Sequence, residues 1–250
     1  MPKHRFYLKP EDWGADSLEL RDDEAHHCRD VMRCGVGEVI SVFDGNGREI
    51  TATIVGVTKK AVSLEAGEEI STTPLPARIT LGQAIPKGKN MDLIIQKATE
   101  LGAARVVPLL TTNTVVQLNE REKVKKQEKW QRVAIEACKQ SGQNWMPEVA
   151  IPQSIGDFVA EASDSLRIVA AIASHSLPLK EIIQNWDREN EARPETASLL
   201  IGPEGDFTTP EVEAATSAGF LPMSLGPIIL RSETAAIYGV SVLAYELMGR

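Results

Sequence analysis

The order of apolar and polar residues changes along this chain, and the change divides the chain into two parts. In the first part apolar and polar residues alternate over short stretches, which is typical of β-strands. Strands are expected at residues 38–44, 48–57 and 61–65, with a Gly-Asn-Gly turn at 45–47, whereas residues 22–33 have helical spacing. Short strands in close succession predict a small β-barrel within residues 1–73.

The second part, residues 74–250, begins with the linker residues Pro74 and Pro76 and then alternates strand-like runs with helical periodicity. The strand candidates are residues 78–83, 105–110, 166–173, 198–201 and 221–225. The helix candidates are residues 91–101, 120–141, 155–161, 179–185, 209–218 and 233–248. This alternation predicts an α/β fold with a mostly parallel sheet and helices on both faces. The polar stretch 187–195 is expected to be a surface loop.

Two helix starts are marked by capping residues. Thr208 and Glu211 have the spacing of a capping box, and Ser232 is a candidate cap for the last helix. That helix carries an apolar stripe, which packs either inside the subunit or against a second subunit: Ala236, Val240, Leu243 and Leu247.

Two Gly-Pro turns are the most informative feature of the chain. Residues 200–207 read Leu-Ile-Gly-Pro-Glu-Gly-Asp-Phe, and residues 225–235 read Leu-Gly-Pro-Ile-Ile-Leu-Arg-Ser-Glu-Thr-Ala. Each turn follows a short apolar strand and precedes a helix, so several backbone N–H and C=O groups are left free to hold a polar ligand. Two such turns indicate a pocket built mainly from main-chain atoms.

The residues around these turns restrict the ligand. The chain contains neither the G-x-G-x-x-G pattern of dinucleotide sites nor the G-x-x-x-x-G-K-[ST] pattern of phosphate-binding loops. Glu204 and Asp206 would repel a polyphosphate but tolerate a cation, such as the sulfonium of S-adenosylmethionine. Taken alone, purely structural turns remain the commoner explanation of such a pattern.

Composition and charge bear on disulfides, metal binding, membrane insertion and nucleic-acid binding. The three cysteines show no C-x-x-C spacing and are expected to be free thiols, and we expect no metal site. Neither a signal peptide nor a membrane span is expected, which favours a cytoplasmic protein. The net charge is −8, yet residues 121–132 are rich in Lys and Arg. This run is either a phosphate-facing surface or, more simply, a solvated helix face carrying i,i+4 ion pairs.

The two turns resemble the cofactor loops of the SPOUT superfamily of knotted methyltransferases. Further stretches look like the RsmE-type family, which methylates N3 of a uridine in small-subunit (16S) ribosomal RNA: residues 4–6, 26–33, 43–47, 97–102 and 136–142. The resemblance implies a PUA-like RNA-binding barrel at 1–73 and a trefoil-knotted methyltransferase domain at 74–250. It also implies S-adenosylmethionine as cofactor, small-subunit ribosomal RNA or an assembled particle as substrate, and a homodimer.

The resemblance also assigns residues. The positions matching the cofactor loops are Ala173, Ile201, Gly202, Pro203, Glu204, Gly205, Leu225, Gly226, Ile229, Leu230 and Thr234. Arg231 and Glu204 are the catalytic candidates. The structural alternative for Arg231 is pairing with Glu204 or Glu233, and the alternatives for Glu204 are orienting Arg231 and binding backbone donors. The candidates for RNA binding are Arg5, His26, Arg29, Arg33 and Lys97.

Four positions depart from the family pattern. Asp206 stands where the first loop usually has a second glycine, and Asn113, Gln143 and Ile228 lie where arginines are typical. Two further hypotheses therefore stay open: a related methyltransferase acting on a different RNA base, and a non-catalytic RNA-binding assembly factor.

Overall fold

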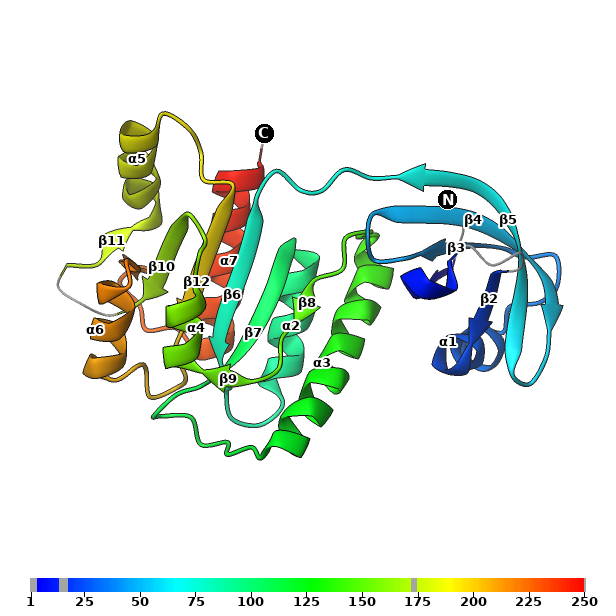
Figure 1. Cartoon of the computed structure of the whole chain (residues 1–250), viewed down its shortest axis with the longest axis horizontal. Coiled ribbons are helices and arrows are strands. Elements are labelled where there is room, and N and C mark those ends of the chain that lie inside the picture. The colour runs from blue at the N-terminus through cyan, green and yellow to red at the C-terminus, as the bar shows by residue number, and fades with distance from the viewer. Residues whose placement is uncertain (1–3, 14–17, 172–174, 250) are drawn as a thin grey trace. The chain divides into compact units, whose positions relative to one another are not determined.

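The computed structural model describes residues 4–13, 18–171 and 175–249, and the chain forms two compact units (Figure 1). The first unit comprises Met1–Pro74 together with Cys138–Met146, and the second comprises Leu75–Ala137 and Pro147–Arg250. The division expected from the sequence had left residues 138–146 in the second domain. The hydrogen bonds that join this segment to Gly45, Gly47 and Glu49 leave no periodic pattern in the sequence.

The first unit contains a five-stranded sheet in the order β1-β3-β4-β5-β2. Its β1–β3 pair is parallel and its other pairs are antiparallel. The elements are β1 (Arg5–Tyr7), η1 (Pro10–Asp12), β2 (Leu18–Arg21), α1 (Asp22–His26), η2 (His27–Val31), β3 (Val39–Phe43), β4 (Arg48–Val57) and β5 (Ala61–Ser71). Alternating side chains of the strands pack with Ala25 and Cys28 into one apolar core.

The three strands and the helical stretch expected in this region are confirmed, with one difference in length. β5 continues to Ser71 rather than ending at residue 65, because its outer half pairs with β4 beyond a register shift while remaining exposed. Because the outer residues of β5 are exposed, apolar and polar residues do not alternate there, and the predicted strand was too short. β1 and β2 were missed because strands of three and four residues are too short for a periodic signal.

The Gly-Asn-Gly turn holds the segment Cys138–Met146. Gly47 donates its N–H to the Asn144 carbonyl at 3.0 Å, and Met146 donates to the Gly45 carbonyl at 2.9 Å. Gly47 has a φ of +95°, and a Cβ there would lie 2.6 Å from the Trp145 ring. Glycine is therefore required both for the turn and for the close approach of this segment.

The second unit contains an eight-stranded sheet in the order β11-β13-β10-β12-β6-β7-β8, with β9 also paired to β7, and every pair is parallel. Its strands are β6 (Arg78–Ala84), β7 (Ala103–Leu110), β8 (Glu148–Val149), β9 (Gln153–Ser154), β10 (Leu166–Ala170), β11 (Leu177–Pro178), β12 (Thr196–Ile201) and β13 (Leu221–Ser224). Its helices are α2 (Asn90–Glu100), α3 (Glu120–Ser141, whose last turn belongs to the first unit), α4 (Ile155–Glu161), α5 (Leu179–Asn190), α6 (Thr209–Ser217) and α7 (Ser232–Met248).

Helices cover both faces of this sheet, as the sequence predicted. α2, α3, α5 and α7 share one apolar core with the sheet, and α4 and α6 share the other (Figure 1). The apolar stripe of α7 packs inside the subunit, where Val240 and Leu243 are fully buried. Of the two arrangements left open for the stripe, the structure therefore shows the internal one.

Two local predictions need correction. α5 continues to Asn190, so residues 187–190 are helical rather than part of a loop; the helix ends where Glu191 adopts a φ of +55°. The apolar pattern stops earlier because the last turn of α5 is exposed. Ser232 is not the cap of α7 but its first residue, since Arg231 occupies the cap position. The capping box of Thr208 and Glu211 is confirmed.

Candidate functional site

The two Gly-Pro turns meet at one cavity of about 450 Å³, although more than twenty residues separate them in the sequence. The cavity lies at the carboxyl ends of β10, β12 and β13, which is where open parallel sheets bind ligands. Its wall consists of Ala170, Ala171, Ser176, Ile201, Gly202, Pro203, Glu204, Asp206, Met223, Ser224, Leu225, Gly226, Pro227, Ile228, Ile229, Leu230, Arg231, Ser232 and Ala235.

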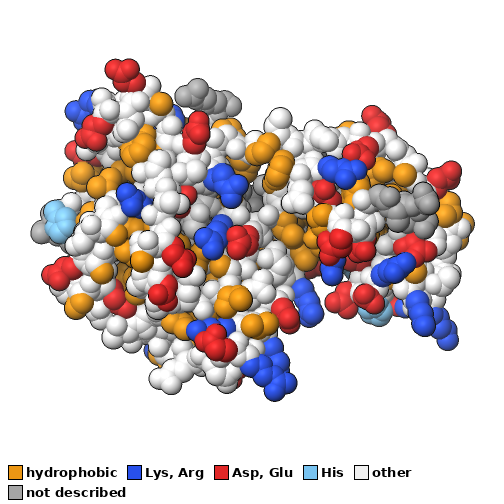
Figure 2. Space-filling view, viewed as in Figure 1, with side chains coloured by type: hydrophobic (Ala, Val, Ile, Leu, Met, Phe, Trp, Pro, Cys, Tyr) orange, Lys and Arg blue, Asp and Glu red, His pale blue; other side chains and the backbone are white. Residues whose placement is uncertain are grey.

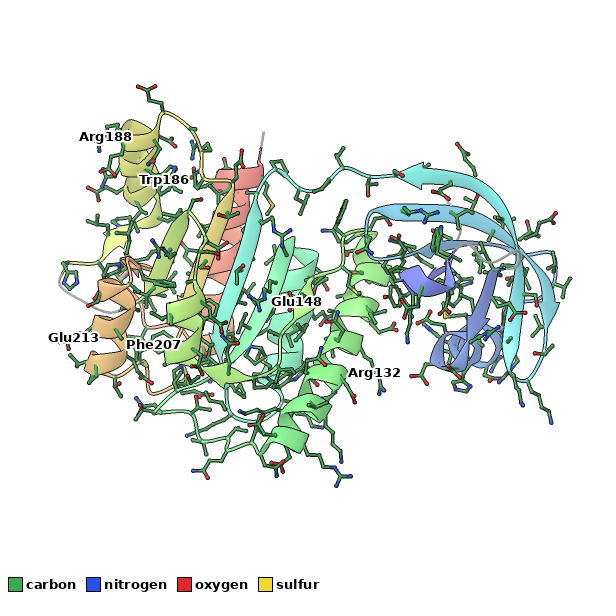
Figure 3. All side chains as sticks on the ribbon, viewed as in Figure 1. Arg132, Glu148, Trp186, Arg188, Phe207 and Glu213 are labelled. Atoms are coloured by element: carbon green, nitrogen blue, oxygen red, sulfur yellow. The ribbon has the colours of Figure 1, made fainter. Side chains whose placement is uncertain are left out.

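The first Gly-Pro loop, residues 202–208, turns back on itself at Asp206. Asp206 has a φ of +58°, a region that glycine adopts freely and aspartate tolerates better than most residues. Its N–H donates to the Pro203 carbonyl at 2.9 Å, and its Oδ1 accepts the Phe207 N–H at 2.8 Å. Aspartate can therefore replace the family's second glycine without unfolding the turn. Phe207 anchors the loop in the core next to α4 and α6 (Figure 3).

Residues 112 and 113, which follow β7, bind this loop from outside. The Asn113 amide donates to the carbonyls of Gly205 and Asp206, both at 2.9 Å. The Thr112 N–H donates to Glu211 at 2.8 Å, and Glu211 also closes the capping box of α6. Burial raises the pKa of Glu211, but hydrogen bonds from Thr112 and Thr208 outweigh it, so the pKa lies below its ordinary value.

Glu204 and Ser232 connect the loop to the end of β6. Oε1 of Glu204 accepts the Lys87 N–H at 3.0 Å, so this carboxylate binds a backbone donor, which is one of the alternatives expected for it. Ser232 Oγ donates to the Gly202 carbonyl at 2.7 Å and accepts from Gln83 Nε2 at 2.9 Å. Ser232 thus links the first loop, α7 and β6 through one buried hydroxyl. Gln83 carried no sequence signal, because a buried glutamine in a strand has no pattern of its own.

The second Gly-Pro loop, residues 225–231, is much more open. Ile228 and Ile229 are 74% and 83% exposed, and Gly226 has a φ of +110°, which favours glycine. Arg231 is exposed at the cavity wall and forms no ion pair with any residue that the structure describes. Its predicted structural alternative, pairing with Glu204 or Glu233, is therefore not found.

The cavity brings together most of the residues assigned from the resemblance. Those on its wall are Ile201, Gly202, Pro203, Glu204, Leu225, Gly226, Ile229, Leu230 and Arg231. Gly205 and Thr234 lie next to the wall without contributing to it, and Ala173 lies outside the described residues. Asp206, Ser232 and Ile228 were not assigned as ligand contacts but line the wall.

The candidates for RNA binding differ in how free their side chains are. Arg33 is exposed, and Lys97 pairs with Glu100 at 2.7 Å. His26 pairs with Asp30 at 2.6 Å, and Arg29 donates to the Thr58 carbonyl at 2.9 Å and to Asp30. These hydrogen bonds, from Arg29 above all, lower the pKa of Asp30 to about 2.

Arg5 has a structural role within the first unit. Its side chain is only 12% exposed and pairs with Glu49 at 3.8 Å, and its guanidinium lies 4.1 Å from the centre of the Phe43 ring. It also donates to the carbonyls of Cys138 and Gln143, at 3.4 and 3.3 Å. Burial lowers the pKa of Arg5, although Glu49 opposes the shift. These contacts leave little of the side chain for RNA.

The charges on the cavity wall fit a cationic ligand without phosphates. Glu204, Asp206 and Arg231 are its charged side chains, and the other wall residues are apolar, small or glycine. Within the described part of the chain no group of three His, Cys, Asp or Glu side chains is placed to hold a metal ion. The described helices include none that is long and apolar enough to cross a membrane. The three cysteines are buried, and none of them forms a disulfide bond with another described residue.

A parallel sheet with a cavity at the carboxyl ends of its strands is typical of α/β proteins that bind small molecules. Comparison with known proteins identifies the family. Residues 73–244 match the RNA methyltransferase domain and residues 20–66 match the RNA methyltransferase PUA domain. The chain is 33% identical to ribosomal RNA small subunit methyltransferase E of Bacillus subtilis over 93% of this chain and 91% of that protein. The Aquifex aeolicus protein of the same name is 32% identical, over 96% and 98%.

Solved structures agree with these relatives. A methyltransferase from Legionella pneumophila, in complex with bound S-adenosylmethionine, superimposes with a TM-score of 0.88 at 35% identity over 98% of both chains. Ribosomal RNA small subunit methyltransferase E from Neisseria gonorrhoeae, bound to S-adenosylmethionine, gives 0.84 at 30% identity over 96% of both. The chain therefore belongs to the RNA methyltransferase family and, within it, to the ribosomal RNA small subunit methyltransferase E group. The resemblance found in the sequence is confirmed, whereas the trefoil knot stays a prediction.

Proposed function

We propose that this protein transfers the methyl group of S-adenosylmethionine to small-subunit ribosomal RNA, at N3 of a uridine. The observation that carries the proposal is the convergence of two distant Gly-Pro loops on one cavity whose described wall carries Glu204 and Asp206. Membership of the methyltransferase E group and the cofactor held by the Legionella and Neisseria proteins support it. A volume of about 450 Å³ lies within the range of small-molecule sites.

The reaction makes two demands on this chain. N3 of uridine must lose its proton to a base or to solvent, and bound S-adenosylmethionine would supply the methyl group to N3 and remain as a neutral thioether. The negative charge of the ionised base spreads over its two flanking carbonyl oxygens. We assign its stabilisation to Arg231, because that side chain is exposed at the wall and has no ion-pair partner among the described residues. We assign to Glu204 the task of holding the first loop on the Lys87 amide.

We assign RNA binding to both units. The first unit, which contains the PUA match, carries His26, Arg29 and Arg33 on its surface, and Lys97 is a candidate on the second. Arg121, Lys125 and Arg132 of α3 form no ion pair within the described residues, which favours the phosphate-facing hypothesis for this helix over i,i+4 pairing (Figure 3). Basic and acidic side chains are otherwise interspersed on the visible surface (Figure 2). The target base must be unpaired, since Watson–Crick pairing hides N3.

We further propose that the protein works as a knotted homodimer in the cytoplasm. Ile228, Ile229, Tyr238 and Tyr245 are large apolar side chains with exposed fractions of 47% or more, and a partner subunit would cover such groups. Light scattering measures the mass in solution, and a monomer at micromolar concentration would reject the dimer.

Two measurements test the function. Calorimetry should detect binding of S-adenosylmethionine, and no binding at millimolar ligand would favour a non-catalytic assembly factor. Nucleoside mass spectrometry of ribosomal RNA from a deletion strain should show loss of 3-methyluridine. Loss of another methylated base instead would favour the hypothesis of a different target. Methylation assays on naked ribosomal RNA and on assembled small subunits would identify the substrate form.

A further inference from the structure

Asp206 places a carboxylate on the wall of the cavity at a position where the turn itself needs none. Its φ of +58° is one that glycine adopts without strain, and its side chain only satisfies the adjacent Phe207 N–H through Oδ1. The residue is half-buried, lines the cavity and forms no ion pair within the described chain. Compared with glycine, aspartate at this position therefore adds a hydrogen-bond acceptor for Phe207 and a negative charge at the cavity wall.

The surroundings leave this charge uncompensated. Among the described residues of the wall, Glu204 is a second acid and increases the negative charge, whereas the cation Arg231 belongs to the opposite loop. Asn113 fixes the Asp206 backbone through its carbonyl rather than through its carboxylate. The loop therefore holds the carboxylate in place, and its charge can interact with a ligand in the cavity.

The two ligands of a methyltransferase differ in charge at one atom. The sulfur of S-adenosylmethionine is a cationic sulfonium, and after transfer the sulfur of S-adenosylhomocysteine is a neutral thioether. A fixed carboxylate in a half-buried site attracts the cation and has little effect on the thioether. A wall with this charge favours the cofactor over the spent product.

We propose that Asp206 gives the cavity a charge preference for the methylated cofactor over the demethylated product, and so promotes product exchange. This inference rests on the proposed function. Asparagine at this position can keep the left-handed turn and accept the Phe207 N–H through its amide oxygen while removing the charge. Asp206→Asn therefore separates the charge of the side chain from its part in the fold.

The test is calorimetry of S-adenosylmethionine and S-adenosylhomocysteine with the wild type, Asp206→Asn and Asp206→Gly. A third ligand is sinefungin, which carries a cationic amine in place of the sulfonium. Asp206→Asn should weaken binding of both cationic ligands about tenfold and change the Kd of S-adenosylhomocysteine less than twofold. Asp206→Gly, which also removes the acceptor of the Phe207 N–H, should weaken binding of both cationic ligands at least as much as Asp206→Asn does. Glu213→Gln, which removes an exposed acid of α6 outside the cavity wall, is the matched control and should leave all three affinities unchanged (Figure 3).

Three outcomes would overturn the inference in different ways. Equal weakening of all ligands would make Asp206 a residue of the fold only. Unchanged affinities in both variants would show that its charge has no effect on the ligands. A wild-type protein that binds neither S-adenosylmethionine nor S-adenosylhomocysteine would reject the proposed function as well as this inference.

Discussion

The two Gly-Pro loops have similar sequences but very different surroundings. Asn113, Glu204, Asp206 and Ser232 all form hydrogen bonds to or within the first loop. The second loop has an N–H bond from Gly226 to Ser224 Oγ at 3.2 Å, and its two isoleucines are mostly exposed. One half of the cavity is therefore fixed before the ligand arrives, and the other half is open to solvent.

This difference indicates a division of tasks. A loop whose backbone is already bonded loses little conformational entropy when a ligand binds, so it suits recognition of an invariant cofactor. A loop with few bonds orders at a larger entropic cost, but it leaves room for a substrate or partner to enter. The first loop fits the cofactor role and the second loop, with Arg231, fits the side from which RNA approaches.

The largest effect is expected at the open loop. Arg231→Ala should lower kcat about 100-fold, because a cation facing the developing charge acts mainly in the transition state. The Kd of S-adenosylmethionine should change less than threefold, since Arg231 does not hold the first loop. Single-turnover methylation and calorimetry measure the two quantities. Arg231→Lys, which keeps the charge, should recover part of the rate, and an unchanged kcat in Arg231→Ala would exclude a catalytic role.

A smaller effect is expected when the fixed loop is loosened. Asn113→Ala removes two hydrogen bonds, each contributing about 1 kcal/mol, and should weaken binding of S-adenosylmethionine by up to about thirtyfold. Asn119 is a matched control because its side chain accepts the Glu122 N–H at 3.0 Å near the start of α3, outside the cavity wall. Asn119→Ala should cost stability without changing cofactor affinity. Equal affinities for the wild type and Asn113→Ala would contradict the idea of a prearranged first loop.

The sequence predicted the parts of the molecule in which one local rule decides the structure. The helix bounds of α3 and α4 and the capping box of α6 follow from periodicity and spacing alone. The two-residue strands β8, β9 and β11 could not be predicted, because pairing with distant strands defines them.

The same limit applies to the site. The resemblance identified the loop residues, but the roles of Ser232 and Asn113 depend on contacts 30 and 92 residues away along the chain. Asp206 was recognised as a departure from the family, and its left-handed backbone explains how the chain accommodates it. A single sequence contains no signal for such long-range hydrogen bonds.

The pH dependence of the fixed loop follows from Glu211. Its folded pKa lies below the unfolded value, so its stabilising contribution is present above the unfolded pKa and is lost as the pH falls through the folded pKa. Glu211→Gln should lower the free energy of unfolding by about 1 kcal/mol at pH 7, and the deficit relative to wild type should shrink below about pH 4. Chemical denaturation at several pH values measures this difference. A deficit that is constant with pH would show that the charge of Glu211 contributes nothing.

The smallest change in the free energy of unfolding of a single subunit is expected from Ile229→Ala in the second loop. A side chain that is 83% exposed buries little apolar area, so the free energy of unfolding should change by less than about 0.5 kcal/mol in dilute solution. The wild type and Ile229→Ala are then compared at higher protein concentration, where self-association raises the Tm. If a partner subunit covers this loop, that rise should be smaller in the variant. A large loss of stability in dilute solution would instead show that the second loop is as tightly packed as the first.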